Sequence, residues 1–241
     1  MKNFQFFLCL YFFPITFFSQ IISDRPDQTE SSLVVGSGKF QIESGLIFEN
    51  NSEQSERNLI TLNNLIRYGI FKGYELRLNT NIINGSHNYT ESKSYVLTDF
   101  EIGAKIQILD NYSKKTKIAF LNHYLFTLKN LYNNNSSGLI SRILISHELN
   151  KNFQIAYNLG YNNYFNIHPN ELIYTLALSK SFSTFSIFCE VFGVETNIIS
   201  QINWDVGITY EFKKNIQIDL AKAKGFNNSL DYFTLGICLL F

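Results

Sequence analysis

The sequence predicts an all-β fold, namely a transmembrane, antiparallel, up-and-down β-barrel of about twelve strands with periplasmic N- and C-termini. Three observations favour it. Apolar and polar residues alternate with a period of two along most of residues 40–241, as in strands with two unlike faces. The expected strands have lengths close to the ~9–11 residues of a tilted strand that crosses a bilayer. Short turns alternate with longer polar loops, which is typical of a bacterial outer-membrane barrel.

The stretch GYELRLNTNII at residues 73–83 shows the alternation clearly. Glu75 and Arg77 fall on one face of the expected strand, while Tyr74, Leu76 and Leu78 fall on the other. The faces of the strands at 115–127 and 171–180 are ambiguous, and a count of ten strands stays open beside twelve. We expect strands near residues 40–50, 58–70, 73–83, 95–109, 115–127, 138–149, 153–162, 171–180, 184–193, 201–212, 216–224 and 231–241.

The bulky apolar face is expected to meet lipid, and the polar face, which also carries Gly and Ala, to line the lumen. Aromatic residues make up 16% of the chain, and many stand near strand ends, where amphipathic rings suit the headgroup region. The chain closes with SLDYFTLGICLLF, an alternating strand that ends in Phe241. We interpret Phe241 as part of the signal for the barrel-assembly machinery, and we expect the protein in the bacterial outer membrane, in contact with its lipid.

The first twenty residues read as a signal peptide, with Lys2 ahead of an apolar run from Phe6 to Phe18. An N-terminal anchor helix is the alternative, but the run is short for a span of ~20 residues and Pro14 interrupts it. The expected organisation is therefore a signal peptide at 1–20, a polar segment at 21–39 and the barrel at 40–241.

Several functions are disfavoured by composition and motifs. A formal net charge of +0 gives no basic surface for nucleic acid. Cys189 and Cys238 face opposite sides by alternation, so we expect no disulfide between them, and no Cys or His spacing indicates a metal or cofactor site. His87 and His168 fall in loops and His123 in a strand. His147 faces outward without a convincing Ser partner, so an enzyme is not expected.

The inward face carries charges that are candidates for a solute path. If Phe71-Lys72-Gly73 is a three-residue turn, Ile70 pairs with Tyr74, and Arg67 then lies opposite Arg77. Like charges placed opposite each other are unfavourable, so neighbouring strands must supply carboxylates. We predict an acid–base network of Glu43, Arg67, Glu75, Arg77, Asp99, Glu101 and Lys105, with Glu190, Asp205 and Asp219 also facing inward.

Two interpretations of these charges stay open. They form a filter or solute site in a channel for small solutes, or they fill a closed structural or adhesive barrel that acts through its extracellular loops. The polar segment at 21–39 also has two interpretations. Arg25, Asp27 and Glu30 belong either to a plug that enters the lumen from the periplasmic end, with Arg25 pairing an inward carboxylate, or to a tail packed at the rim.

Several stretches are similar to one known family. ISDRPDQTESSLVV, GKFQIESGLIFE and LIRYGIFKGYELRLNTN, followed by WDVGITYEF, NIQIDLAKAKG and the closing DYFTLGICLLF, resemble the phenol-degradation meta-pathway (MetA) family of outer-membrane transporters. The resemblance covers nearly all of the chain after residue 20, and RPDQTE is its most specific part. It implies a barrel of this type and the uptake of small hydrophobic or aromatic compounds, with no catalytic residues to carry over.

Overall fold

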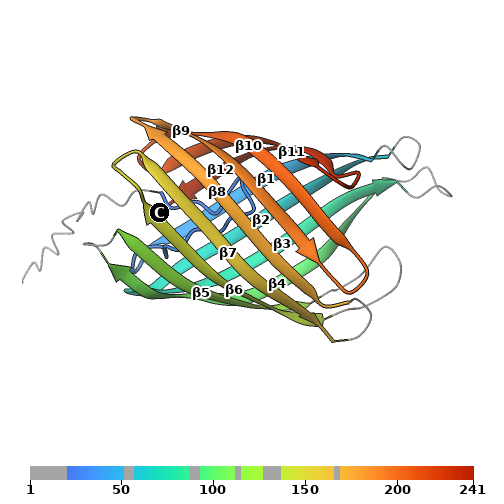
Figure 1. Ribbon diagram of the computed structural model, residues 1–241, viewed down its shortest axis with the longest axis horizontal. Helices are drawn as coiled ribbons and strands as arrows, with labels where there is room; N and C mark the ends of the chain where they lie inside the picture. The colour runs from blue at the N-terminus through green and yellow to red at the C-terminus, as the bar shows by residue number, and fades with distance from the viewer. Residues whose placement is uncertain (1–20, 52–56, 87–92, 112–114, 127–136, 166–168) are drawn as a thin grey trace, which may run out of the picture.

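The computed structural model is a closed barrel of twelve antiparallel strands, each paired with its neighbours in chain order (Figure 1). It describes residues 21–51, 57–86, 93–111, 115–126, 137–165 and 169–241. The predicted all-β up-and-down fold and the count of twelve are both confirmed. The strands are β1 (Phe40–Asn51), β2 (Arg57–Phe71), β3 (Tyr74–Ser86), β4 (Lys93–Asn111), β5 (Thr116–Phe126), β6 (Ser137–Glu148), β7 (Phe153–Tyr164), β8 (Glu171–Phe182), β9 (Phe185–Glu195), β10 (Ser200–Lys213), β11 (Ile216–Gly225) and β12 (Asp231–Leu240).

Short turns join the strands at one end of the barrel, and longer connections join them at the other. The ring closes where β1 meets β12, and the start of β1 lies at the short-turn end beside the end of β12. There the Phe40 N–H donates to the Phe241 carbonyl at 3.2 Å, and the Phe241 N–H donates back at 2.8 Å. No helix among the described residues is long and apolar enough to cross a membrane.

The outward faces of the strands are apolar, as the alternation predicts. In β3, Tyr74 and Leu76 are exposed, whereas Glu75 and Arg77, which alternate with them, are buried. Aromatic rings gather near both ends of the strands. They pair near the short turns as Phe40–Phe241, Phe71–Tyr74 and Phe182–Phe185, and near the long connections as Phe48–Phe233 and Tyr124–Phe126.

The turn between β2 and β3 corrects one detail of the expected register. Phe71, not Ile70, pairs with Tyr74, so the turn itself consists of Lys72 and Gly73. Gly73 takes a φ of +83°, which side chains disfavour. The register shifts between Gly69 and Phe71. That irregularity absorbs one residue, so Arg67 still lies opposite Arg77.

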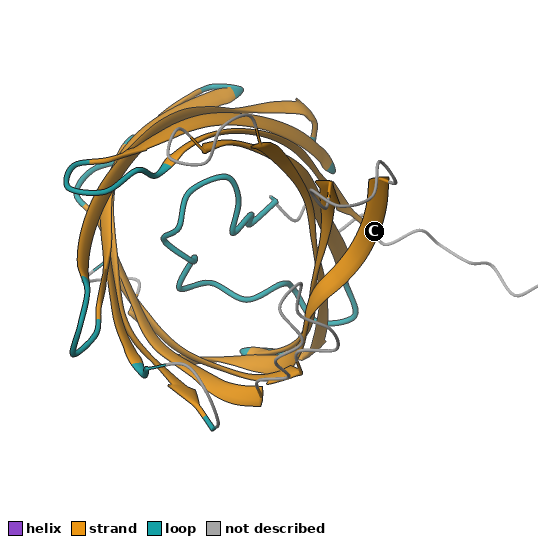
Figure 2. Cartoon of the chain, turned by 90° about the vertical axis from the view of Figure 1, so that its right-hand side faces the viewer, coloured by secondary structure: helices purple, strands orange, loops and turns teal. Residues whose placement is uncertain are grey.

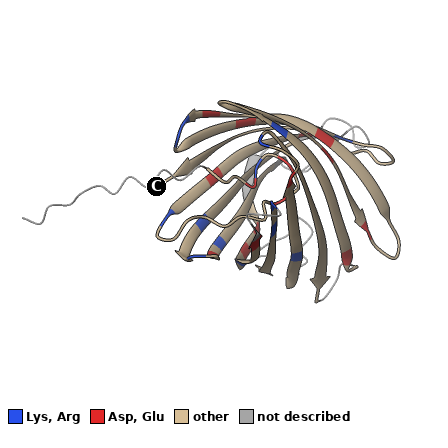
Figure 3. Cartoon of the chain, turned by 60° about the vertical axis from the view of Figure 1, so that its left-hand side comes forward, with Lys and Arg blue, Asp and Glu red and all other residues tan. Residues whose placement is uncertain are grey.

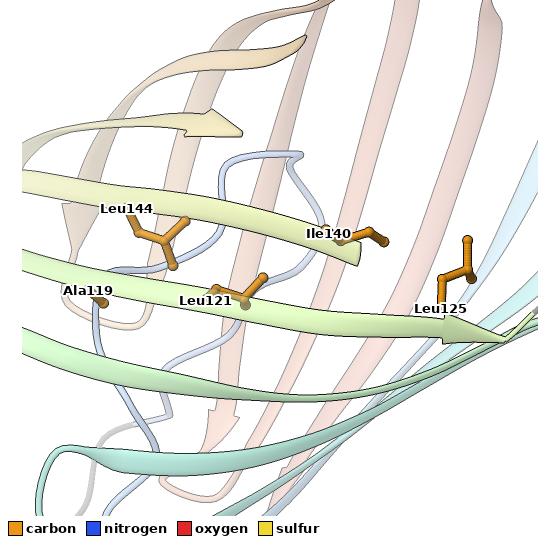
Figure 4. Packing of buried hydrophobic residues seen from close by; sticks show 5 residues of the cluster. All are labelled: Ala119, Leu121, Leu125, Ile140 and Leu144. Carbon is orange, nitrogen blue, oxygen red and sulfur yellow. The ribbon is translucent and has the colours of Figure 1, made fainter. Parts of the chain in front are cut away.

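The inner wall of β5 and β6 carries an apolar cluster. Ala119, Leu121 and Leu125 from β5 pack with Ile140 and Leu144 from β6, and all five are buried (Figure 4). The outward residues of β5, such as Phe120 and Tyr124, are also apolar. Two apolar faces on one strand explain why alternation left residues 115–127 ambiguous.

Residues 21–39, which precede β1, lie inside the barrel. Viewed from the end that carries the long connections, residues 21–39 form an irregular loop within the ring of strands (Figure 2). The two ends of this loop meet at the wall, where Ile21 and Val35 pack with Cys238 and Leu240 of β12. We call residues 21–39 the inner segment.

Candidate functional site: the lumen and its inner segment

A network of buried charges joins the inner segment to the first four strands. Asp24 is its centre, because its Oδ2 lies 2.6 Å from Arg77 Nη1, 2.8 Å from Lys105 Nζ and 3.2 Å from Arg67 Nη1. The acidic and basic positions lie on the strands and on the segment inside them (Figure 3). We define the Asp24 network as Asp24, Glu43, Arg67, Glu75, Arg77 and Lys105.

The register of β1 to β4 explains how this network is assembled. Arg67 and Arg77 are direct partners across β2 and β3, which would be unfavourable alone. Glu75 of β3 accepts two hydrogen bonds from Arg67, one from Nε at 2.8 Å and one from Nη2 at 2.9 Å. Glu43 of β1 accepts from Arg67 Nη1 at 2.8 Å. The carboxylates thus separate the two guanidinium groups.

Asp24 completes the charge balance from inside the barrel. Burial opposes its charged form, but Arg67, Lys105 and Arg77 together hold the pKa of its carboxyl well below the usual range. Asp24 also ties the segment to itself, since its Oδ1 accepts from the Ser31 N–H at 2.8 Å. Residues 24–31 therefore form a closed loop that rests on this network.

Glu30 extends the charge contacts toward β6. It lies 2.9 Å from Arg77 Nη2 and 3.7 Å from Lys105 Nζ. On its other side, Arg142 of β6 reaches it at 3.4 Å, a longer contact than those around Asp24. Ser32 follows, with its hydroxyl 2.6 Å from the Ser146 hydroxyl of β6.

Arg25 points to the adjoining wall, formed by β11 and β12 next to β1. Its Nη2 lies 3.1 Å from Asp219 Oδ1 and donates to Thr234 Oγ1 at 2.8 Å. Two glycines leave room for the guanidinium. A Cβ added to Gly45 would lie 2.0 Å from Arg25 Cζ, and one added to Gly236 would lie 2.5 Å from Arg25 Nε. The predicted pairing of Arg25 with an inward carboxylate is thus present, and the carboxylate is Asp219.

A group of acids without a basic partner lies where the segment passes β9 and β10. Glu190 accepts from the Gln28 N–H at 2.7 Å and from the Thr29 hydroxyl at 2.5 Å. Asp205 is 1% exposed, and neither of its carboxylate oxygens has a hydrogen-bond partner among the described residues. Burial, with Glu190 and Asp205 nearby, raises the pKa of the half-buried Asp27 carboxyl well above its usual range.

The inner segment separates two cavities, each with a volume of about 440 Å³. The loop-side chamber opens toward the long connections and is lined by residues such as Asn81, Asp99, Glu101, His123 and Tyr232. The turn-side chamber opens toward the short turns and is lined by residues such as Lys117, Glu148 and Gln217. Arg25, Pro26 and Asp27 line both chambers. The barrier between them is therefore thin at this point.

The inward residues named from the sequence do not all meet. Glu43, Arg67, Glu75, Arg77 and Lys105 come together in the Asp24 network. Asp99 and Glu101 lie farther toward the long connections, where Asp99 accepts from Asn81 at 3.2 Å and Glu101 contacts His123 at 2.6 Å. The carboxylates Glu190, Asp205 and Asp219 are buried on β9, β10 and β11.

Sequence reasoning missed three participants. Asp24 was not singled out, although it stands directly before the Arg25-Pro26-Asp27 stretch that was. Arg142 was missed because its strand carries a nearly continuous apolar sequence, LISRILIS. His123 was noted only as a strand residue, and alternation from Leu121 would have turned it inward.

The cysteines and the other histidines named from the sequence take no part in the Asp24 network. Cys189 and Cys238 are free, the first exposed and the second buried. His147 lies between the hydroxyls of Thr116 and Tyr157, at 2.9 and 3.1 Å. No group of three or more His, Cys, Asp or Glu suited to a metal ion occurs in the part of the chain that the structure describes. The expected signal peptide at 1–20, His87 and His168 lie outside the described residues.

Solved structures of outer-membrane channels share this fold at low sequence identity. A KdgM porin aligns with a TM-score of 0.61 and 13% identity, covering 83% of this chain and 99% of its own. A NanC porin aligns with a TM-score of 0.62 and 8% identity, over 82% and 98%. An outer membrane channel from Pseudomonas putida F1 aligns with a TM-score of 0.63 and 10% identity, over 90% and 100%.

No curated protein sequence matches the chain. A family model, in contrast, matches it over residues 23–237, which include most of the inner segment and all but the last residues of the barrel. This range contains most of the stretches that resemble the family. The chain belongs to the MetA-pathway of phenol degradation family.

Proposed function

We propose that the protein is an outer-membrane channel for small solutes, in which the inner segment controls passage between two chambers. The observation that carries this proposal is that the same three residues, Arg25, Pro26 and Asp27, line both chambers. A shift of this short stretch would join two cavities of about 440 Å³ each into one path along the barrel.

The apolar outer face supports the membrane location. Exposed side chains such as Leu76, Ile102, Leu176 and Leu220 are each more than 40% exposed on strand faces that point away from the lumen. A barrel leaves no unpaired strand edge in the bilayer, because every backbone group bonds within the ring. The paired rings near both strand ends fit the two interfaces of a membrane.

The linings favour small solutes that carry polar groups. Asn63, Asn79 and Asn81 form a hydrogen-bonded row on the wall of the loop-side chamber, at 3.1 and 2.7 Å. Apolar residues such as Ile47 and Ile140 face the same chamber. A compact molecule with both an apolar body and a polar group therefore suits this lining better than a pure hydrocarbon.

The second candidate is a closed structural barrel, and the Asp24 network favours it. All six members are nearly fully buried and pair with one another. A buried network of this kind can fix one arrangement of a narrow interior without serving a solute. The two candidates differ in whether the inner segment has to move.

A reversible lock on the segment tests this difference. The Ser32 and Ser146 hydroxyl oxygens are 2.6 Å apart, so Ser32→Cys with Ser146→Cys brings two thiols within disulfide range. The background lacks Cys189 and Cys238, and Ser146→Cys alone is the matched control. The measurement is the swelling of liposomes that carry refolded protein, with a small sugar, an amino acid and a phenol-sized aromatic as solutes.

A channel gated by the segment predicts slower swelling for the oxidised pair, recovery on reduction and no redox effect in the control. Deletion of residues 21–32 should raise swelling above the unmodified protein. If neither the unmodified protein nor the deletion variant swells liposomes with any solute, although both are folded, the closed barrel is the correct alternative.

A further inference from the structure

A row of polar side chains interrupts the apolar outer face of the barrel. Ser44 of β1, Asn64 of β2 and Thr80 of β3 are direct partners across the two strand pairs. They point away from the lumen, because they alternate along their strands with inward residues such as Glu43 and Arg67. We call these three residues the outer polar row. The rows on either side of it are apolar and consist of Ile42, Ile66 and Leu78, and of Leu46, Leu62 and Ile82.

The outer polar row lies at the depth of the hydrocarbon core. Along β1, Ser44 is equally far from Phe40 and from Phe48. The Phe40 ring belongs to the aromatic pairs near the short turns, and the Phe48 ring to those near the long connections. Such rings stand at the two interfaces of a transmembrane barrel, so a residue midway between them is surrounded by lipid tails. A polar group without a partner is costly there, because lipid tails neither donate nor accept hydrogen bonds.

The three side chains do not satisfy one another. The Ser44 hydroxyl donates to Asn64 Oδ1 at 2.6 Å. Asn64 Nδ2, however, reaches Thr80 Oγ1 only at 3.5 Å, beyond the usual N–H···O range of about 2.7–3.2 Å. Among the described residues, no acceptor is found for the second amide hydrogen of Asn64 or for the hydroxyl hydrogen of Thr80. Asn64 is half-buried, so it presents an incompletely bonded amide on the outer face.

A second outward asparagine provides the contrast. Asn122 of β5 also lies on the outer face, opposite its direct partner Ser141 of β6. Its Nδ2 makes two hydrogen bonds, to Ser141 Oγ at 2.7 Å and to the Ile140 carbonyl at 3.2 Å. An asparagine on the outer face can therefore be bonded within the chain and meet only lipid. Asn64 lacks this arrangement, which points to a partner outside the chain.

Symmetry identifies the partner that Asn64 fits. Two copies of a barrel that are inserted in the same direction can form a twofold pair only about an axis along the membrane normal. Residues at one depth then face residues at the same depth, so Asn64 can meet its own counterpart. An amide is complementary to itself, because it carries both donors and an acceptor oxygen with two lone pairs. Ser44 uses one lone pair of Asn64 Oδ1, and the other is available to the second amide.

We propose that the outer polar row is the centre of a contact between two copies of this chain, in which the two Asn64 amides bond one another and the flanking apolar rows pack together. This inference rests on the membrane location given above and not on the passage of a solute. The inner face of the same strands supports it, because the Asp24 network fixes the wall there through Arg67 and Glu75. A surface that is already fixed loses little freedom on association.

Energy transfer between barrels in liposomes tests this contact. The refolded protein carries Lys72→Cys, in the exposed turn between β2 and β3, in a background without native cysteines. Separate batches are labelled there with a donor dye and an acceptor dye, mixed, and diluted with increasing amounts of lipid. We expect energy transfer that depends on the labelled fraction as in a two-barrel complex and that falls when lipid dilution separates the copies.

Two variants with matched controls locate the contact. Asn64→Leu removes the amide and should shift the midpoint of dissociation at least tenfold toward higher protein density, whereas Asn122→Leu should leave it unchanged. Ile66→Trp keeps the outer polar row and adds bulk beside it, so it should also weaken the pair. Its control is Leu176→Trp on β8, which lies on the opposite side of the ring and should have no effect. The folded band in gels is checked for every variant.

The outcomes separate this inference from the proposed channel. Absence of energy transfer at every lipid dilution means that the row faces lipid or a different protein, and it overturns the contact. Energy transfer that Asn64→Leu and Ile66→Trp leave intact places the association on another face and overturns it as well. Energy transfer lost in both variants without any liposome swelling supports the contact and counts against the channel. Swelling without energy transfer supports the channel and overturns the contact.

Discussion

On the β1–β4 side of the barrel, the inner segment meets fully buried ions at 2.6–3.2 Å around Asp24. On the β6–β9 side it meets hydroxyl groups of Ser146 and Thr175, a longer ion pair to Arg142, and acids that lack a basic partner. The comparison teaches which contacts resist movement. Breaking a buried ion pair leaves a charge uncompensated, whereas a hydroxyl contact contributes only about 1 kcal/mol. The segment is therefore anchored on one side and releasable on the other.

The largest effect expected is from Arg67→Met. It leaves Asp24, Glu43 and Glu75 with less positive charge in a buried site, and we expect a loss of about 3–5 kcal/mol in the free energy of unfolding. This loss is measured by unfolding in urea, which is monitored through the shift of the folded band in gels. The control on the releasable side is Arg142→Met, which should cost less, about 1–2 kcal/mol, because Glu30 keeps its ion pair with Arg77. Equal losses for the two variants would show that the two sides do not differ.

An intermediate effect is expected from Gly45→Ala. The new methyl group would overlap the Arg25 guanidinium, which lies 2.0 Å from the position of the added Cβ. Arg25 then has to leave Asp219, so swelling rates should rise severalfold, with a stability loss of about 1–3 kcal/mol. The double variant Gly45→Ala with Arg25→Ala relieves the overlap. It should be no less stable than Arg25→Ala alone, and additive losses would contradict the steric explanation.

The smallest effect is a pH dependence from the releasable side. Because the pKa of Asp27 is raised in the closed arrangement, its contribution to closure is complete below the ordinary pKa of an Asp carboxyl. It is lost as pH rises through the raised value. Swelling should therefore increase with pH. Asp27→Asn should flatten the profile at the closed level, and an unchanged slope in that variant would assign the dependence to other groups.

The fold was predictable because alternation, strand length and loop length all depend on local sequence. Outward residues such as Leu76 and inward ones such as Arg77 are assigned by their neighbours alone. The site was less predictable, because it depends on a segment without periodicity. Nothing near Asp24 in the sequence indicates that it meets Arg67, Arg77 and Lys105, because these residues lie on three different strands of the barrel.

For the strand at 115–127, the prediction of its two faces failed for a different reason. Alternation identifies a face only when the two faces differ in polarity, and Leu121 inside the barrel is as apolar as Phe120 outside. Arg142 and His123 were hidden by the same apolar context, although both stand on the inward face. Their inward placement therefore required the pairing of β4, β5 and β6 before it could be recognised.

The path of the inner segment also has a mechanical consequence for the seam between β1 and β12. The Ser23 hydroxyl and the Asp24 N–H both donate to Glu43 of β1, and Arg25 donates to Thr234 of β12. Ile21 packs on Cys238 beside the same junction. The segment thus links β1 to β12 at the place where strands distant in sequence close the ring. Separation of these two strands, which would open the wall to the bilayer, first requires the contacts of the segment to break.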